Sequence, residues 1–311
     1  MKKLILSLLL LPVVVSAQDK LSESNYRIYS VKQGKEVSLK EIVSDMDNYD
    51  VLLFGEEHND SVTHYLEHSI LELLHLKFGN EVALSLEMFD RDVQPVMDEY
   101  LQGFIKEKHF KKDARVWSNY RDYRPMVEFA RQKKLDVVCA NAPTRYTNLA
   151  GRKGQDALDM LPSATKEFFA PIPYDTATGK YYNKLMGLDH SAAPTTTDTS
   201  KAKAVPSMAA MMRGFNMIMA QSLWDATMAH SITRYLKKNK GKKVLHVNGR
   251  FHSDEGFAVA TQLYNYNSKI KRMIVSTSSD ESFPNIKWSE YAKLGNYIII
   301  TDPKIPRTYE N

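Results

Sequence analysis

Short apolar segments alternate along this chain with segments of helical period. Runs rich in Val, Ile and Leu, each long enough for one buried strand, occupy residues 50–54, 82–86, 135–140, 244–248, 272–277 and 297–301. Between most of them, apolar residues recur every three or four positions, as over 62–74 and 93–104. Strands that are apolar on both faces are typical of parallel sheets covered by helices. The pattern predicts an α/β fold with a mixed, mainly parallel central sheet flanked by helices.

Residues 142–240 interrupt this alternation. They show no strand pattern and contain helical pieces, a polar stretch rich in Pro, Thr, Ser and Ala at 190–207, and a long helical region from about 207 to 239. We therefore expect a helical insertion at about 142–240 in a domain that spans 18–311, with a flexible loop at 190–207.

The first seventeen residues predict a signal peptide. Lys2 and Lys3 precede an apolar run, and Val15-Ser16-Ala17 is the small-residue pattern that a signal peptidase cleaves before Gln18. The run is too short for a membrane span. A lipoprotein would carry a cysteine at the cleavage site, and none stands there. We expect an exported protein, periplasmic or secreted, that is soluble and not a lipoprotein.

Charge and cysteine content narrow the class of protein. The net charge is +5, and removal of residues 1–17, with their two lysines, lowers it to +3. The longest basic run is 237–243, so we expect no nucleic-acid partner. Cys139 is the only cysteine and lies in an apolar run, which indicates a buried thiol rather than a disulfide.

Polar residues gather where four of the predicted strands end. In open α/β sheets these ends face one crevice, where ligands bind. The residues that follow the four ends are Gly55-Glu56-Glu57-His58, Glu87, Asn141 and Gly249-Arg250-Phe251-His252. Two ends share the pattern Gly-x-x-His, in which we expect the glycine to allow a sharp turn and the histidine to point back over the sheet edge.

These side chains suit more than one chemistry. Two imidazoles with Glu87 and Glu56 or Glu57 could hold a divalent transition metal such as Mn, Co or Zn, or could act as acid and base without a metal. A structural alternative is that the acidic residues after the first strand only cap a helix. Two like motifs favour a functional cleft, because gathering polar groups at one edge costs desolvation. His64 is a further candidate metal ligand.

Several blocks, in order along the chain, resemble the ChaN-type haem-binding uptake family, whose superfamily also contains the Tiki metalloproteases and erythromycin-esterase-like enzymes. The blocks are GEEHND followed by His64, LEMFDRDVQPVMDEYLQG (86–103), Trp117 with YRPMVEFAR (123–131), NAPTRY with GRKG (141–154), QSLWDATMAHSI (221–232) and VNGRFHSDEG (247–256). The resemblance implies a mixed α/β core with a helical insertion, export to the cell envelope, and a role in binding haem or handling its iron. It makes a homodimer and outer-membrane haem uptake machinery candidate partners besides haem.

The resemblance places the candidate haem contacts in the insertion, where YYNKLMGLDH (181–190) is similar to the family's Tyr-x-x-x-Leu stretch ahead of a His. Haem iron accepts an axial Tyr or His, and its propionates need cations. The candidates are Tyr181, Tyr182 and His190 as ligands and Lys184 and Arg213 as propionate partners. Asp225, on the long helical region, needs a partner such as Arg250 or a hydroxyl if its face is buried.

Two functions of different class follow. The preferred one is an exported haem-binding protein that serves in haem or iron uptake or handling. The alternative is a metal-dependent hydrolase of a peptide or small ester, for which the resemblance to Tiki-like relatives assigns the metal to His58, His252 and Glu87. Its catalytic residues would lie among Glu56, Glu57, His58, Glu87 and His252, with Glu56 or Glu87 as general base.

Overall fold

One eight-stranded sheet forms the centre of the computed structural model, which describes residues 21–188 and 208–310. The strand order is β2-β1-β8-β7-β3-β6-β4-β5. The strands are β1 (Tyr26–Ser30), β2 (Lys35–Val37), β3 (Val51–Glu56), β4 (Val82–Asp90), β5 (Asp136–Asn141), β6 (Lys243–Gly249), β7 (Arg272–Ser279) and β8 (Tyr297–Thr301). From β8 to β5 every neighbouring pair is parallel, whereas β1 is antiparallel to both β8 and β2. The predicted α/β class with a mixed, mainly parallel sheet is confirmed.

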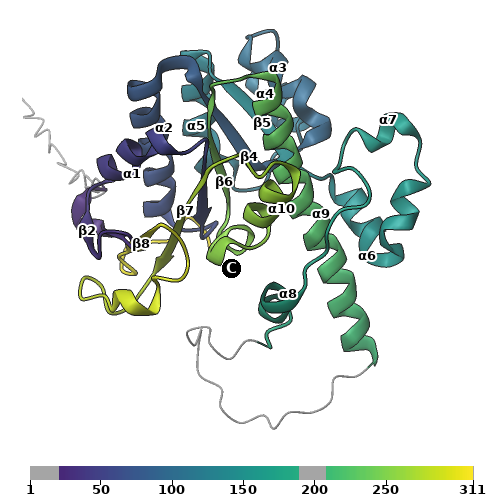
Figure 1. The fold of residues 1–311 in the computed structure, drawn as a ribbon. Helices are drawn as coiled ribbons and strands as arrows, with labels where there is room; N and C mark the ends of the chain where they lie inside the picture. The colour runs from purple at the N-terminus through teal and green to yellow at the C-terminus, as the bar shows by residue number, and fades with distance from the viewer. Residues whose placement is uncertain (1–20, 189–207, 311) are drawn as a thin grey trace, which may run out of the picture.

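Helices cover both faces of this sheet (Figure 1). They are α1 (Leu39–Asp45), α2 (Ser61–Phe78), α3 (Gln94–Leu101), α4 (Glu107–Asp113), α5 (Tyr120–Lys133), α6 (Thr144–Asp159), α7 (Ser163–Lys166), α8 (Gly179–Leu185), α9 (Met208–Lys238) and α10 (Val259–Tyr266). Leu52 and Phe54 of β3 pack into the layer that contains α1, α2 and α5, whereas Val51 and Leu53 pack against α9 and α10. Because successive strand residues face opposite sides, burial on both sides requires an unbroken apolar run.

All six apolar runs predicted as strands form strands, and three of them end two or more residues later than predicted. β3 continues through Gly55 and Glu56, β4 continues four residues beyond Leu86 to Asp90, and β7 continues to Ser279. The β1–β2 hairpin was not predicted, because β1 alternates buried and half-buried residues and β2 has three residues, none of them buried.

Between β5 and β6 the described part of the chain contains helices only. The C-terminal part of α9 packs on the sheet and on α10, while Leu223 and Ala226 pack against α6. In Figure 1 the N-terminal part of α9 extends beyond the sheet, with α6 and α8 near it. α8 thereby comes close to the ends of the parallel strands. The predicted signal peptide and the predicted loop at 190–207 lie outside the described residues, and none of the described helices is long and apolar enough to cross a bilayer.

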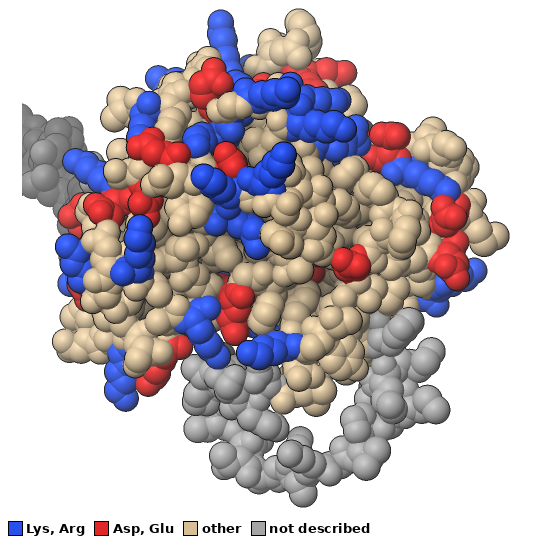
Figure 2. All heavy atoms as spheres, viewed as in Figure 1, with Lys and Arg blue, Asp and Glu red and all other residues tan. Residues whose placement is uncertain are grey.

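Charged side chains of both signs are spread over the surface that Figure 2 shows. Lys and Arg are most frequent along its upper part, and Asp and Glu lie among them elsewhere. Basic side chains therefore gather along one part of this face, and acidic side chains are scattered over the rest.

His246 is a buried histidine in the middle of β6 that gives the fold a pH dependence. Its side chain is 0 % exposed and its Nδ1 lies 2.9 Å from Ser85 Oγ on β4. Burial, together with the nearby charge of His252, lowers the pKa of His246 to about 3 from an ordinary value of 6.5. The folded protein therefore keeps His246 neutral at a pH where the unfolded chain takes up a proton.

We expect His246→Gln to reduce the acid sensitivity of folding. Stability that His246 contributes is present above pH 6.5 and is lost as the pH falls from 6.5 toward 3, at about 1.4 kcal/mol per pH unit. Urea unfolding at several pH values should show a shallower decline for the variant. His109→Gln, at an exposed histidine of α4, is the control and should follow the parent. Equal slopes for His246→Gln and the parent would contradict the prediction.

Candidate functional site

The two Gly-x-x-His motifs meet because β3 and β6 are parallel neighbours whose ends are in register. Gly55 pairs with Asn248, and Glu56 pairs with Gly249. A Cβ added at Gly249 would lie 2.8 Å from His58 Nε2 and 3.7 Å from Glu87 Oε2. On the other side of Glu87, its Oε1 lies 3.5 Å from His252 Nε2. The structure thus brings His58, Glu87 and His252 into one pocket at the carboxyl edge of the sheet.

Close approach, rather than a sharp turn, explains the glycine of each motif. Gly249 has φ −55°, and Gly55 continues strand β3, so neither needs a left-handed backbone. A Cβ on Gly55 would lie 2.9 Å from Arg250 Cα, in the second motif, and one on Gly249 would meet the ring of His58, in the first. Each glycine makes room for the other motif. The chain does turn after Gly249, into a short 3-10 helix, but this turn needs no left-handed glycine.

An irregularity in β4 positions Glu87. The pairing of β4 with β6 ends at Leu86, and the register with β5 shifts between Leu86 and Asp90. Glu87, 6 % exposed, follows directly, and its Oε2 accepts a 2.7 Å hydrogen bond from the Gly249 N–H. A bulge of this kind commonly aims a side chain away from the regular ladder. Here it holds one oxygen of Glu87 at the Gly249 N–H and the other 3.5 Å from His252 Nε2.

Both histidines are oriented by a buried carboxylate. Nδ1 of His58 lies 2.6 Å from Glu56 Oε1, and Nδ1 of His252 lies 2.5 Å from Asp225 Oδ1. Since a carboxylate only accepts, both Nδ1 atoms carry hydrogen and both Nε2 atoms are directed to the pocket. A carboxylate behind each imidazole is the arrangement found around metal-bound histidines.

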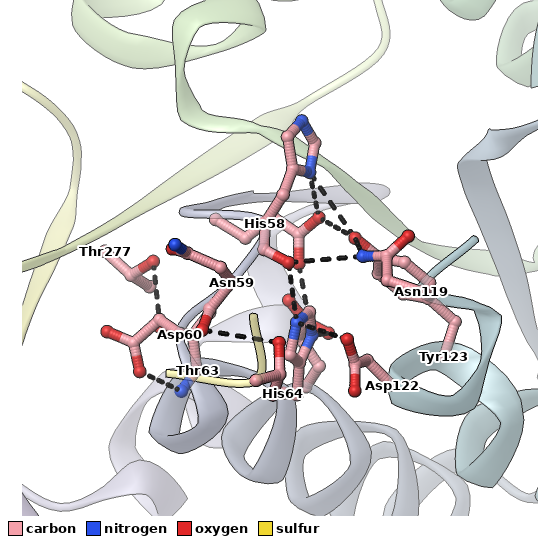
Figure 3. Close-up of polar contacts among 12 residues, drawn as sticks. His58, Asn59, Asp60, Thr63, His64, Asn119, Asp122, Tyr123 and Thr277 are labelled. Carbon is pink, nitrogen blue, oxygen red and sulfur yellow. Dashed lines mark hydrogen bonds and ion pairs between the residues drawn. The ribbon is translucent and has the colours of Figure 1, made fainter. Parts of the chain in front are cut away.

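A tyrosine in turn holds each of these carboxylates. Tyr123, from α5, donates a 2.7 Å hydrogen bond to Glu56, and Tyr181, from α8, donates one of 2.7 Å to Asp225. Figure 3 shows Tyr123 beside His58. Asp225 was singled out in the sequence as needing a partner. Tyr123 opens the family block 123–131 but was not predicted as a site residue.

Negative charge in the pocket favours a cation between the histidines. Burial opposes protonation of His252, yet Glu87 and Asp225 raise its pKa to about 9. Burial also opposes protonation of His58, but the hydrogen bond from Nδ1 to Glu56 and the charges of Glu87 and Glu56 raise its pKa. A second proton, at Nε2 of each ring, can neutralise the negative charge of this pocket. A metal ion bound at the Nε2 atoms can do the same.

Residues 42–263 match the family described as haem-binding uptake, Tiki superfamily, ChaN. The chain belongs to this ChaN family. The matched segment includes both motifs, Glu87 and the whole of α8 and α9. The resemblance predicted from the sequence blocks is confirmed.

Among similar solved structures, one supports the fold. A structure of ChaN from Campylobacter jejuni that describes cofacial haem binding aligns with a TM-score of 0.65 at 16 % identity, over 90 % of this chain and 98 % of that one. The type III effector HopBA1 aligns with a TM-score of 0.44 at 10 % identity, over 85 % and 93 % of the two chains. An erythromycin esterase mutant, EreC, in its open conformation gives 0.43 at 10 % identity, over 89 % and 83 %. Only the first is near enough to carry an argument about fold, and no curated protein matches.

Other predicted site residues of this ChaN-family chain lie around the pocket rather than in it. Glu57 faces Arg250 at 3.8 Å and Arg307 at 3.1 Å. Asp60 caps α2 by accepting hydrogen bonds from the backbone of residues 62 and 63, as the structural alternative expected, but no such cap is formed by Glu56 or Glu57. His64 lies with Glu56 and Glu67, and Figure 3 shows it on the side opposite the ring of His58.

The haem candidates fall into three groups. Tyr181 is 8 % exposed and bound to Asp225, and burial with the charge of Asp225 raises its pKa, whereas Tyr182 is 38 % exposed. Nζ of Lys184 lies 3.5 Å from Glu255 and covers the ring of Phe251. His190 lies outside the described residues, as does the side chain of Arg213.

Proposed function

We propose that this protein is an exported haem-binding protein that serves in haem or iron uptake. Membership of the haem-binding uptake family over residues 42–263 carries the proposal. The fold shared with a ChaN structure that binds haem cofacially supports it. Export rests on the signal peptide predicted for residues 1–17.

The residues of α8 suit a haem. The group needs an axial ligand such as a tyrosinate, an apolar surface for its ring, and cations for its propionates. Tyr182 is exposed and can reach a ligand outside the protein, while Tyr181 points inward to Asp225. Exposed apolar side chains lie close in sequence or in space, namely Leu188 and Phe251, the latter beneath Lys184. Lys180 is an exposed cation on the same helix.

Of the two adjacent tyrosines, Tyr182 is therefore the residue that would hold iron. A phenolate is disfavoured at Tyr181, because burial and a neighbouring carboxylate raise its pKa. Tyr181 instead positions Asp225 and, through it, His252. The bound haem iron would supply the redox chemistry. The protein would supply the axial ligand and the apolar surface against the haem ring.

We expect Tyr182→Phe to weaken haem binding by at least about tenfold, since it removes an axial ligand. Haemin titration followed by Soret absorbance measures this. Tyr181→Phe is the matched control, because it deletes the same hydroxyl one residue away and leaves Tyr182 in place. An unperturbed Soret band in the parent protein would end the proposal, and equal loss in both variants would remove Tyr182 as the ligand.

A metal-dependent hydrolase is the second candidate, and one observation favours it. His58 and His252 each have a carboxylate behind Nδ1 and direct Nε2 toward Glu87. These three side chains would hold a divalent ion, which would polarise the carbonyl of an ester or peptide. Glu87 could instead act as the general base, with the two histidines holding the ion, because Glu56 is fully buried and its Oε1 is shared by His58 and Tyr123. Ester or peptide hydrolysis that depends on added Mn²⁺, Co²⁺ or Zn²⁺ and is lost in His252→Ala would support this function, and its absence in the metal-loaded protein would contradict it.

A further inference from the structure

We propose a second buried site for a divalent transition-metal ion, formed by Glu56, His64 and Glu67. It lies between the end of β3 and the first turns of α2, separate from the pocket of His58, Glu87 and His252. The ligand atoms that these three side chains offer all lie within 4.8 Å of one another. The expected occupant is a divalent first-row ion, since the set combines one imidazole with two carboxylates.

The hydrogen bond of His64 leaves a lone pair for a cation. Nε2 of His64 lies 3.1 Å from the carbonyl oxygen of His58, which can only accept. That nitrogen therefore carries the hydrogen, and in the neutral ring Nδ1 is unprotonated. Nδ1 faces Glu67 Oε2 at 3.0 Å and Glu56 Oε2 at 3.4 Å. With both carboxyl groups ionised, three acceptor atoms therefore lie within 4.8 Å of one another.

The spacing of these atoms matches coordination of one ion. Ligands on metal bonds of roughly 2.1 Å stand about 3.4 Å apart in a tetrahedral site. The two distances from His64 Nδ1 to the carboxylates, 3.0 and 3.4 Å, fall close to this. The carbonyl of His58, and Asp122 Oδ2 at 3.9 Å from His64 Nε2, would act behind the ring as partners that hold its orientation.

Burial makes this convergence costly without a cation. The side chains of Glu56 and Glu67 are 0 % exposed and that of His64 is 6 % exposed. Glu56 Oε2 and Glu67 Oε1 have no hydrogen-bond partner among the described residues. Burial and the charge of Glu56 raise the pKa of Glu67 well above its ordinary value, so the metal-free cluster holds a proton there. Two buried carboxylates are unfavourable unless a proton or a metal ion compensates them. A metal ion would satisfy Glu56 Oε2 directly, and it would satisfy Glu67 Oε1 if that carboxylate bound through both of its oxygens.

Glu56 connects the two sites. Its Oε1 accepts from Tyr123 and contacts His58 Nδ1, while its Oε2 faces His64. Figure 3 shows His58 and His64 on opposite sides of this group of contacts. An ion held by Glu56 Oε2 would fix the carboxylate that orients His58. Occupation of the second site is therefore expected to strengthen binding in the first.

The experiment counts metal equivalents in the purified full-length protein after removal of metal with a chelator. Co²⁺, followed by its visible absorption and displaced by Zn²⁺, is the probe. The parent protein is expected to bind two equivalents, and His252→Ala one. Adding Glu67→Gln to His252→Ala should weaken the affinity for the remaining metal ion by about 100-fold or more, because a ligand is lost. Adding Glu72→Gln instead, at an exposed glutamate of the same helix, is the matched control and should retain it.

Anomalous X-ray scattering from crystals soaked in Zn²⁺ provides a readout that needs no variant. A peak between Glu56, His64 and Glu67 is the expected result. A peak only near His252 would overturn the inference. So would a second bound metal ion that is retained in both Glu67→Gln and His64→Gln. Either result would show that protons neutralise this cluster. The Soret titration with haemin is independent of these outcomes, so failure here leaves the proposed haem function standing.

Discussion

Replacement of Gly55 by alanine is expected to destabilise the protein by about 1–3 kcal/mol, the usual cost of overpacking a close contact. A Cβ at this position would lie 2.8 Å from Ser253 Oγ and 2.9 Å from Arg250 Cα. Real Cβ atoms essentially never approach so closely, and one of the two neighbours is backbone. The turn that carries His252 must therefore move away from β3. Urea unfolding measures the loss, and metal affinity should fall with it because His252 moves.

A double-mutant cycle with Ser253→Ala tests the physical cause. Ser253→Ala removes the closer contact but leaves Arg250 Cα in place, and it also deletes a 3.1 Å hydrogen bond from Asn248. In the double variant we expect part of the Gly55→Ala cost to disappear, so the two changes should couple. Full additivity, or a Gly55→Ala protein as stable as the parent, would show that the close approach of the two motifs does not constrain the fold.

His252→Ala is expected to abolish metal binding in the pocket of His58, Glu87 and His252. Asp225→Asn should weaken it by about 10–100-fold, the range seen when the partner behind a metal-bound histidine is removed. The amide has one oxygen where the carboxylate has two, so it cannot accept from His252 and Tyr181 at two separate oxygens as Asp225 does. His68→Ala is the control, because that half-exposed histidine of α2 faces Glu72 and Phe129, away from the pocket.

The pH dependence of this binding separates a metal ligand from a structural histidine. Because the pKa of His252 is raised to about 9, an ion must displace a proton at neutral pH. Affinity should rise by about tenfold per pH unit up to about pH 9 and then level off. In the metal-free protein the sign is opposite: stability contributed by the protonated His252 is complete below pH 6.5 and is lost as the pH rises through 9. Metal affinity in His252→Ala that equals the parent's, at any pH in this range, would refute the assignment.

The sequence predicted the layers of this fold well and its edges poorly. A strand buried on both faces must be apolar at every position, so β3 through β8 are visible as runs. β1 and β2 lie at one edge of the sheet, where β1 alternates buried and half-buried residues and β2 has no buried residue, so neither forms an apolar run in the sequence. The end of β4 was placed at residue 86 because Glu87 is charged, yet the strand continues through a bulge that buries that carboxylate.

By itself the sequence determined the α/β class, the family and the two motifs at the strand ends, because these depend on local periodicity and on short ordered patterns. Only the tertiary structure decided what stands behind each histidine. Glu56 is two residues from His58, but Asp225 and Tyr181 reach His252 from helices 27 and more residues away. The same holds for the glycines, whose role is the approach of one motif to another across parallel strands. Contacts of this kind depend on strand register and helix packing, which a linear pattern does not encode residue by residue.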